Sequence, residues 1–466
     1  MRRTKIIATI GPSTNTRKGI SQLIRSGMNI ARINMAHITD YSELERTITN
    51  IRAESKKQKK FIGILIDIAG PKVRTKIKEG SIDVKKGQRY KIGYGKDYDI
   101  PLTLKIQIDK KFLGYKIKVD DGNFEFTISK ITPDFIEIVS DDVGCVYDGK
   151  GVNFPEIHTG LSVLTSKDRR DIESIANMDI DFIALSFVKK GTDIRTVNNI
   201  LEKVKIKIPI IAKIERPEAI DNLDDIILGF DGILVARGDL GVEMPIENLP
   251  LMQKNIVNKC RLYSKPVIIA TQMLESMINN PHPTRAEITD ISSAIIEGCD
   301  AIMLSAETAS GKYPLEAVET MDRVASNIEQ QIFDNKFGSI DNIFSSKHSI
   351  KSVISSAAKS IAHNLDIGPI VVMTESGSTA LSMSNRRPDT EIVALSPFKK
   401  ICQKMTIFWG VDPSISKNFT DQAEMFNEIS KFIKKKNSLK KGDSYVIISG
   451  MLGVTGKTNM VKIHNI

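Results

Sequence analysis

Polar side chains recur where short apolar runs end, and their types suit chemistry on a phosphate. Several lie two positions apart, and residues i and i+2 of a strand point to the same side. The set comprises Arg32 and Asn34, Asp67, Ser186, Lys213 and Glu215, Arg237 and Asp239, Thr271 and Gln272, and Ser305 and Glu307. Carboxylates bind hard cations, and Arg or Lys bind phosphate oxygens. Together these residues predict a site for Mg²⁺ plus a phosphate.

One such pair alone has a simpler explanation, because Lys213 and Glu215 could form an ion pair inside a core. Seven strand ends carrying such groups make that explanation inadequate for the whole set. The sequence has no GxxxxGK[ST] segment, no GxGxxG segment with a following acidic residue, and no legible Ser/His/Asp or Cys/His triad. Phosphoryl transfer needs none of these, since it depends on charge neutralisation and in-line positioning.

The apolar runs themselves predict the scaffold. They are continuous and rich in β-branched residues, as in strands buried on both faces, and amphipathic stretches separate most of them. The eight runs are Lys5–Ile10, Ile30–Met35, Phe61–Ile66, Phe182–Phe187, Ile208–Ile214, Gly232–Ala236, Pro266–Ala270 and Ala301–Leu304. Eight alternating units predict an α/β fold, a (β/α)8 TIM barrel, whose active site forms at the carboxyl ends of the strands.

Two further domains interrupt and follow the barrel, which we assign to residues 1–69 and 151–334. Residues 70–150 change to a period of two and predict an inserted all-β lid domain. Residues 72–118 carry 14 basic and 5 acidic side chains, which fits either a solvated basic face or a lid over an anionic ligand. After a polar linker at about 335–349, residues 350–466 predict a C-terminal α/β domain.

Composition narrows the class of protein. The 466 residues carry a formal net charge of +10, which could indicate nucleic acid, an acidic substrate or a compositional bias. Only 6% of residues are aromatic and they do not interleave with the basic runs, so we expect no nucleic-acid partner. The four cysteines form no CxxC pair. We find no signal peptide and no membrane-spanning run, and therefore expect a cytoplasmic protein with no membrane partner.

At these residues the sequence resembles the pyruvate kinase family over nearly its full length. The matching segments include Thr9–Ser13, Lys150–Asn153, Ile208–Arg216, Val235–Gly241, Ala270–Met277, Pro283–Glu287 and Met303–Thr308. The resemblance implies a barrel, a lid inserted after the third strand and a C-terminal α/β domain. It also implies phosphoryl transfer from phosphoenolpyruvate to ADP, giving pyruvate and ATP, with Mg²⁺ (or Mn²⁺) as cofactor.

The resemblance also assigns roles to single residues. It implies that Glu215 and Asp239 bind Mg²⁺. The substrate carboxylate is expected at the Gly238 backbone and the Thr271 hydroxyl, the phosphoryl group at Arg32, and the developing charge at Lys213. The residues expected on the nucleotide side are Asn34, His37, Arg74 and Lys150. Those expected in the water chain that protonates the enolate are Thr271, Ser305 and Glu307.

Several positions depart from the common family pattern, and three of them concern a bound monovalent cation. Ala36 stands where that pattern has Ser, Ile68 where it has Thr, and Lys72 where it has Glu. In potassium-dependent members the Asn, Ser, Asp and Thr positions surround K⁺. Here Asn34 and Asp67 remain, Ala36 offers no oxygen, and an ammonium carries the same charge as K⁺. We therefore predict that Lys72 replaces the ion, as in the subset of the family that does not require potassium. The alternative is that Lys72 is one more surface lysine of a basic lid.

The C-terminal domain contains a possible effector loop. Thr374, Ser376, Gly377, Ser378 and Thr379 lie between a predicted strand and a predicted helix, where hydroxyls and amides can bind an anion. An ordinary helix cap explains the same residues. Glu375 has the wrong charge for a phosphate partner, so we predict a weak or absent response to fructose 1,6-bisphosphate. Family analogy suggests a homotetramer.

Two other functions remain as alternatives. One is a different Mg²⁺-dependent barrel enzyme acting on phosphoenolpyruvate or pyruvate, such as a carbon–carbon lyase. Such an enzyme would use the same metal and the same class of substrate. Arg74 and Lys150 on the expected nucleotide side disfavour it. The other is a non-enzymatic binding protein on a degenerate barrel, which the intact Lys213, Glu215 and Asp239 disfavour.

Overall fold

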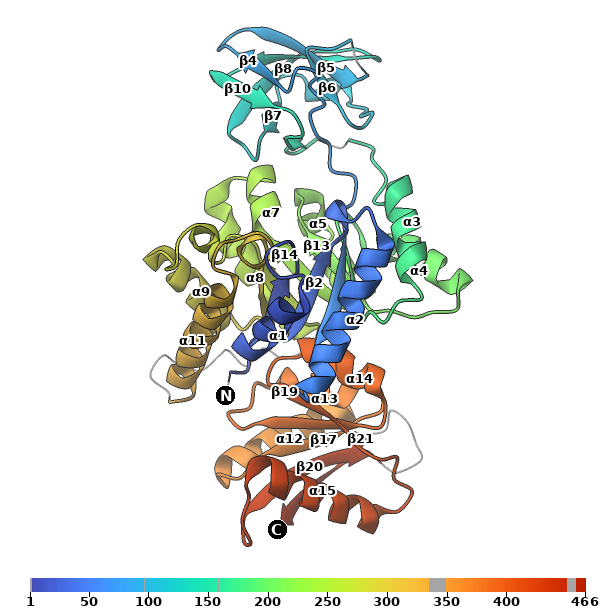
Figure 1. The fold of residues 1–466 in the computed structure, drawn as a ribbon, viewed down its shortest axis with the longest axis vertical. Coiled ribbons are helices and arrows are strands. Elements are labelled where there is room, and N and C mark those ends of the chain that lie inside the picture. Colours follow the sequence, from blue (N-terminus) through green and yellow to red (C-terminus); the bar gives the residue numbers. More distant parts are fainter. Residues whose placement is uncertain (1, 96, 158, 335–348, 451–457) are drawn as a thin grey trace. The chain divides into compact units, whose positions relative to one another are not determined.

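The computed structural model describes residues 2–95, 97–157, 159–334, 349–450 and 458–466 (Figure 1). Its chain divides into two compact units. The first comprises Met1–Ile66, Met178–Ile183 and Val257–Ile466, and the second Asp67–Asn177 and Ala184–Ile256. The predicted linker at 335–349 lies outside the described residues except for Ser349.

Eight parallel strands close into a barrel in the order β1-β16-β15-β14-β13-β12-β3-β2, which confirms the predicted fold class. Their bounds are β1 (Lys5–Thr9), β2 (Ile30–Asn34), β3 (Gly63–Ile68), β12 (Phe182–Leu185), β13 (Ile210–Ile214), β14 (Gly232–Ala236), β15 (Val267–Ala270) and β16 (Ala301–Leu304). Nearly every residue in these strands is buried. Burial on both faces explains why the runs are continuously apolar and not alternating.

Helices separate these strands along the chain. They are α1 (Arg17–Ser26), α2 (Tyr41–Lys57), α3 (Ser166–Ile175), α4 (Ile194–Lys203), α5 (Pro217–Asp221), α6 (Leu223–Gly229), α7 (Arg237–Glu243), α8 (Leu249–Leu262), α9 (Arg285–Glu297), α10 (Ala306–Ala309) and α11 (Pro314–Phe333). Local sequence sets several of the starts. Thr165 is the N-cap of α3 and Thr284 that of α9, each in a reciprocal capping box with the acidic residue three positions on.

The segment inserted between β3 and β12 carries two sheets. A six-stranded sheet has the order β11-β7-β8-β9-β5-β6, and β10 pairs with β4. The bounds are β4 (Ser81–Val84), β5 (Arg89–Tyr94), β6 (Ile100–Leu102), β7 (Lys116–Val119), β8 (Phe124–Ile131), β9 (Ile136–Ser140), β10 (Gly144–Tyr147) and β11 (Val152–Asn153). Alternating buried residues such as Phe126 and Ile128 join a hydrophobic core of the insert's own. The period of two therefore indicated the correct structure.

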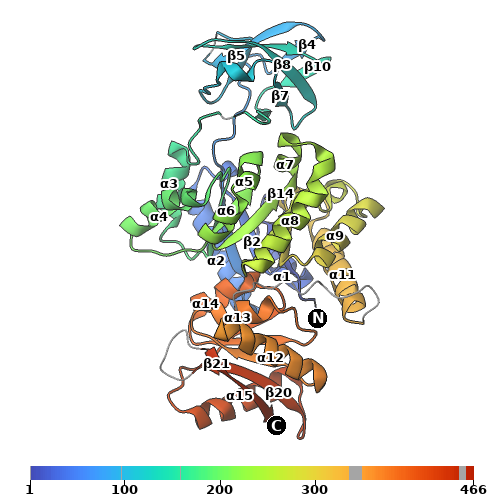
Figure 2. The ribbon, with the colours of Figure 1, turned by 180° about the vertical axis from the view of Figure 1, so that it is seen from behind.

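The C-terminal domain is a five-stranded sheet in the order β19-β18-β17-β20-β21. Its elements are α12 (Ile350–Asn364), β17 (Ile370–Met373), α13 (Ser378–Ser384), β18 (Ile392–Ser396), α14 (Lys399–Lys404), β19 (Val411–Ile415), α15 (Gln422–Asn437), β20 (Ser444–Gly450) and β21 (Thr458–Asn465). On one face α15 packs through Met425, Ile429 and Ile433, whereas α12 and α13 contact the sheet elsewhere (Figure 2).

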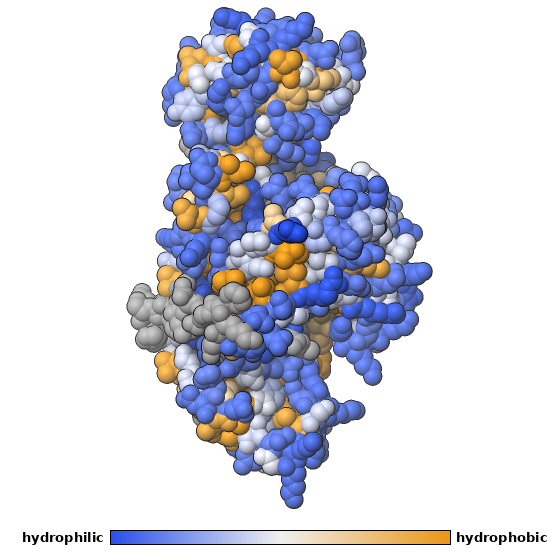
Figure 3. All heavy atoms as spheres, turned by 90° about the vertical axis from the view of Figure 1, so that its left-hand side faces the viewer, coloured by the Kyte–Doolittle hydropathy of each residue, from blue (hydrophilic) through white to orange (hydrophobic). Residues whose placement is uncertain are grey.

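Sequence analysis did not identify β19. The strand contains Pro413 and lies at the edge of its sheet, where a residue without an N–H is tolerated. The face seen in Figure 3 is mainly hydrophilic, with hydrophobic residues in small patches. Among the described residues, no helix combines the length and hydropathy needed to span a membrane.

Candidate active site

Lys213, at the carboxyl end of β13, is the centre of a buried polar cluster in the second unit. Its Nζ lies 2.7 Å from Glu215 Oε1 and 3.2 Å from Asp67 Oδ1, and it donates to Ser186 Oγ at 2.8 Å. Asp67 and Ser186 are each 1% exposed. The polar ends of β3, β12 and β13 therefore meet around one ammonium group, as the strand-end argument predicted for these residues.

The hydroxyl of Ser186 orients this cluster. It donates to the Ile68 carbonyl at 2.6 Å and accepts from Lys213. Glu215 is fixed independently, because its Oε2 accepts from the Phe187 amide at 2.8 Å. Sequence analysis noted Ser186 as a strand end but gave it no role. The signal that could have identified it is its position directly after a continuous apolar run.

Two carboxylates of the second unit are suited to a divalent cation. Burial raises the pKa of Glu215, the Asp239 carboxylate raises it further, and the Lys213 ammonium opposes both effects. Glu215 and Asp239 therefore interact as like charges, and a divalent cation would relieve their repulsion. Among the described residues no group of three or more His, Cys, Asp or Glu side chains could hold a metal alone. Two protein carboxylates fit Mg²⁺, which takes its other ligands from substrate phosphates and water.

Lys72 contacts one of these carboxylates. Its Nζ lies 3.0 Å from Asp239 Oδ1, and both side chains are partly exposed. Sequence analysis expected Asn34 and Asp67 as its neighbours, whereas the polar partner of its ammonium among the described residues is Asp239. An ammonium on the chain that enters the lid thus reaches a predicted metal ligand on α7.

Arg74 and Lys150 lie on the two chain segments that connect the lid. Arg74 pairs with Gly151 in an isolated antiparallel bridge, and its Nη1 donates to the Gly149 carbonyl at 2.8 Å. The Lys150 ammonium lies 2.7 Å from Asp120 Oδ1, and this hydrogen bond raises the pKa of Lys150 and lowers that of Asp120. The two predicted nucleotide-side cations of this unit therefore lie on two segments that a backbone bridge joins.

A further polar contact in the same unit was absent from our predictions. Asn153, in β11, donates to Glu243 Oε1 of α7 at 2.8 Å, and both residues are buried. Burial raises the pKa of Glu243. The contact joins the end of the lid to the helix that begins at Arg237, and no local sequence pattern indicates a pair 90 positions apart.

The first unit holds the remaining predicted residues. Arg32, at the end of β2, is buried and its Nη1 donates to Thr9 Oγ1 at 2.9 Å. Asn34 caps the 3-10 turn Met35–His37 by accepting from the Ala36 amide at 3.1 Å, and His37 is exposed. Thr9 is thus a positioning residue for Arg32 that sequence analysis did not assign.

Glu307 and Thr271 occupy unusual environments in this unit. Glu307 accepts from the amides of Ser305 and Leu274, at 2.7 Å and 3.2 Å, and burial raises its pKa. Directly after β15, Thr271 and Gln272 have φ angles of 68° and 55°. Two consecutive side-chain-bearing residues in the left-handed region are strained, and such strain clusters at functional sites.

The predicted effector loop forms hydrogen bonds within itself. The Gly377 amide donates to Thr374 Oγ1 at 3.0 Å, the Ser376 hydroxyl to Ser378 Oγ at 3.1 Å, and Thr379 pairs with Thr458. The helix cap is Gly377, with a φ of 83°, and not a serine. No side chain caps this helix, so the expected cap by Ser376 or Ser378 is not formed, and the hydroxyls of Thr374, Ser376 and Ser378 instead bond within the loop.

Comparison with known proteins finds similarity to one family along the whole chain. Family models described as "Pyruvate kinase, barrel domain" and "Pyruvate kinase, alpha/beta domain" match residues 1–318 and 352–464. A pyruvate kinase of Bacillus licheniformis is 39% identical over 100% of this chain and 80% of its own length. One of Clostridium perfringens is 38% identical over 100% of both chains.

A solved structure also matches this chain over its full length. The crystal structure of a pyruvate kinase from Cryptosporidium parvum matches with a TM-score of 0.92 and 33% identity, covering 100% of this chain and 96% of the other. Sequence, domain order and fold agree along the whole length of the molecule. The chain therefore belongs to the pyruvate kinase family.

Proposed function

We propose that this protein transfers the phosphoryl group of phosphoenolpyruvate to ADP, giving pyruvate and ATP, in a Mg²⁺-dependent reaction that does not need K⁺. The observation that carries the proposal is the buried Lys213 ammonium, held by two carboxylates and one hydroxyl at the end of β13. A fixed cation of this kind stabilises charge that develops during the reaction, at no cost of reorganisation.

The chemistry needs no covalent intermediate on the protein. The bond between phosphorus and the enol oxygen of phosphoenolpyruvate breaks, and a bond from phosphorus to a β-phosphate oxygen of ADP forms. Arg32 binds the transferring phosphoryl group, and Lys213 stabilises that group and the enolate oxygen left behind. Glu215 and Asp239 would hold Mg²⁺, whose contribution when bound is to neutralise phosphate charge. Gly238 and Thr271 receive the substrate carboxylate.

The enolate carbon must then gain a proton. We assign this step to a water chain bounded by Thr271, Ser305 and Glu307. The raised pKa of Glu307 supports the assignment, because it increases the fraction of Glu307 that carries a proton to donate to the water chain. The strained backbone at Thr271 supports a positioning role for its hydroxyl.

Independence from K⁺ rests on two residues. Ala36 supplies no side-chain oxygen to an ion, and Lys72 already reaches Asp239 with its ammonium. Asn34 and Asp67 are the remaining polar groups of the family's cation site. We propose that the Lys72 ammonium supplies the monovalent positive charge that other members take from solution.

The experiment measures pyruvate and ATP formation from phosphoenolpyruvate, ADP and Mg²⁺ in buffer free of K⁺ and NH₄⁺, before and after K⁺ is added. We expect full activity without K⁺, and activity lower by about 10² to 10³-fold with Lys213→Met. Activity only after K⁺ addition would retain the kinase and refute the role of Lys72. Turnover of phosphoenolpyruvate or pyruvate without ADP would instead support a lyase.

The proposal extends to partners. Asn34, His37, Arg74 and Lys150 are proposed to contact the nucleotide, and the assembly is proposed to be a homotetramer in the cytoplasm. Exposed Ile350 and Val353 on α12 offer apolar area for such an interface. Light scattering tests this by giving a mass of four chains or of one. Fructose 1,6-bisphosphate, added to the same activity assay, is expected to change the apparent substrate affinity little.

A further inference from the structure

The two chain segments that lead into and out of the lid contact one short helix, α7. On the first segment the Lys72 ammonium lies 3.0 Å from Asp239 Oδ1, and on the second Asn153 donates to Glu243 Oε1 at 2.8 Å. Asp239 and Glu243 are four positions apart in α7, so they lie on the same face of the helix. All four residues belong to the second unit. One face of α7 therefore holds both segments.

The contact between Asn153 and Glu243 is the more buried of the two. These residues are 7% and 4% exposed, whereas the side chains of Lys72 and Asp239 are 29% and 28% exposed. Within the described parts of the chain, Asn153 Oδ1 and Glu243 Oε2 are buried and have no hydrogen-bond partner. Breaking the bond between the two side chains would leave further buried polar atoms unpaired, which is costly. This contact is therefore the firmer attachment of the lid segments to α7.

Asn153 is also part of the lid's own sheet. It lies in β11, the edge strand of the six-stranded sheet, which pairs with β7. The same segment carries Lys150, and Gly151 pairs with Arg74 in the antiparallel bridge. A Cβ built on Gly151 would lie 3.2 Å from Cε of Lys72, so the two segments pack closely here. Restraint of Asn153 therefore also restrains the sheet and both predicted nucleotide-side cations.

A buried arginine supports the carboxylate of Glu243. Burial raises the pKa of Glu243, and the Arg216 guanidinium opposes this effect. Arg216 Nη2 also donates to the Ile157 carbonyl at 3.1 Å, four positions after Asn153. The segment that leaves the lid is thus held at two points. Arg216 directly follows the predicted metal ligand Glu215, so both points of attachment lie close in the chain to such a ligand.

We propose that Asn153 and Glu243 are positioning residues for phosphoryl transfer, and that their hydrogen bond fixes the nucleotide-side cations relative to the helix that carries Asp239. In-line transfer depends on the placement of ADP relative to the metal and the phosphoryl group. Neither residue is assigned a contact with substrate. The kinetic part of this inference rests on the proposed function, whereas the position of the lid can be measured without turnover.

Steady-state kinetics of the whole protein test the positioning role. Asn153→Ala should raise the KM for ADP about tenfold, because Lys150 and Arg74 are both placed by the released segment, and the KM for phosphoenolpyruvate by about twofold at most. Asn153→Asp, which puts two carboxylates together, should have a larger effect. Asn153→Asp/Glu243→Gln restores one hydrogen bond with donor and acceptor exchanged, and should recover most of the loss seen in Asn153→Asp.

Distances between spin labels test the same contact without turnover. Labels at Lys130→Cys in β8 and Lys203→Cys in α4, both exposed, report on the lid and on a helix of the same unit. Cys145, the one described cysteine that is not buried, is replaced by serine. Electron–electron resonance should give a broader distance distribution in Asn153→Ala than in the labelled parent. The distribution should narrow again in Asn153→Asp/Glu243→Gln.

Thr127→Val is the matched control. It removes a hydrogen bond of 2.9 Å between Thr127 and Asp141 inside the lid, and should change neither the distances nor the KM for ADP. An effect equal to that of Asn153→Ala would show that any loss of lid stability suffices, and would overturn the proposal.

Three further outcomes would also overturn it: an unchanged distance distribution in Asn153→Ala, equal increases in the KM for both substrates, or no recovery in the exchanged pair. If the wild type has no kinase activity, the distances still decide whether the bond holds the lid. Failure of this inference is therefore distinguishable from failure of the proposed function.

Discussion

Lys213 and Lys5 are equally buried, each 9% exposed, yet their surroundings differ in kind. Lys213 lies near the carboxyl end of a strand, beside two carboxylates and a hydroxyl. Lys5 begins a strand, and its described hydrogen bond is to a backbone carbonyl. Carboxylates support the charge of the first, whereas burial lowers the pKa of the second to about 8. Equal burial therefore does not define a lysine's role; its partners do.

Lys72 and Lys150 can be compared with the two buried lysines, because their side chains are more exposed to solvent. Each lies near one carboxylate, Lys72 near Asp239 at 3.0 Å and Lys150 near Asp120 at 2.7 Å. Their side chains are 29% and 40% exposed, so water screens their charges more than that of Lys213. The four lysines form a series in which the effect of removing the charge should decrease as exposure rises.

The largest effect is expected at Lys213. Lys213→Met should lower kcat by about 10² to 10³-fold, because a fixed cation at the developing charge is lost. Steady-state kinetics measure this, with Lys203→Met, an exposed position on α4, as control. A KM effect alone would place Lys213 in ground-state binding and remove it from the transition state.

Lys5 should show its effect in stability. The unfolded-chain value is 10.5 and the folded one about 8, so the unfolded state binds more protons between these pH values and wild-type stability rises with pH across them. Lys5→Met should therefore be more stable at pH 7. The gain is about 3 kcal/mol from the pKa difference, less about 1 kcal/mol for the lost hydrogen bond.

Urea unfolding at pH 7 and pH 9.5 checks this expectation. The difference between Lys5→Met and wild type should shrink as pH rises through 8, while Lys57→Met should show no such trend. If the free energies of unfolding of Lys5→Met and wild type instead changed with pH in the same way, the lowered pKa of Lys5, and with it the contrast with Lys213, would be contradicted.

Lys72 should affect the ion requirement. The double variant Ala36→Ser/Lys72→Glu restores the family's common residues at these positions. Without K⁺ its kcat/KM should fall about tenfold, the equivalent of roughly 1.4 kcal/mol, and K⁺ should restore it. Titration of activity with K⁺ measures this, and Lys76→Glu, an exposed lid position, is the control. If the double variant ignores K⁺, Lys72 is a surface residue of the lid.

The smallest effect is expected at Lys150. Lys150→Gln removes a cation paired with Asp120, and because solvent screens such a pair its contribution is small. The KM for ADP should rise up to about fivefold with kcat nearly unchanged. Initial rates at varied ADP measure both constants, and a kcat loss equal to that of Lys213→Met would break the proposed series.

The sequence by itself determined the barrel, the all-β insert, the C-terminal domain and the strand-end residues. Continuous apolar runs such as Ile210–Ile214 indicate burial on both faces, and alternation in Phe124–Ile128 indicates burial on one. These patterns are local, and each is set by the solvent exposure of a single element. The contact of Lys213 with Glu215 is local for the same reason, since i and i+2 in a strand share a side.

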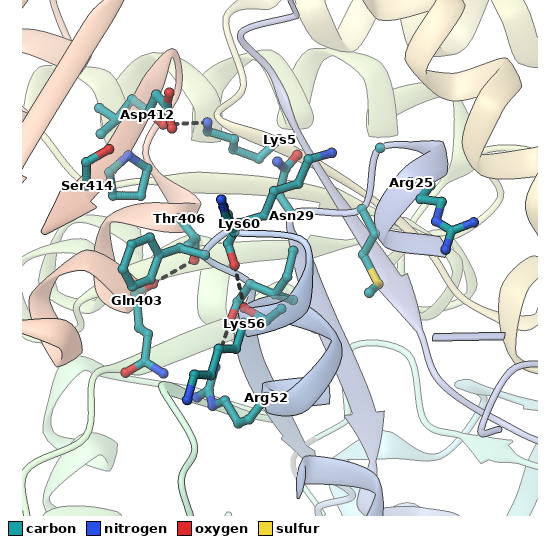
Figure 4. Close-up of a pocket in the computed structure, with 18 of the residues that line it drawn as sticks. Lys5, Arg25, Asn29, Arg52, Lys56, Lys60, Gln403, Thr406, Asp412 and Ser414 are labelled. Carbon is teal, nitrogen blue, oxygen red and sulfur yellow. Dashed lines mark hydrogen bonds between the residues drawn. The ribbon is translucent and has the colours of Figure 1, made fainter. Parts of the chain in front are cut away.

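Only the tertiary structure decided which distant groups meet. Nothing local joins Lys72 to Asp239, 167 positions away, or places Pro413 on an edge strand. Thr271 and Gln272 adopt left-handed φ angles, which neither residue type favours. Such strained conformations persist only where the surrounding structure holds them. The buried Lys5 ammonium meets the Val411 carbonyl, 406 positions away (Figure 4), because folding packs the start of β1 against β19.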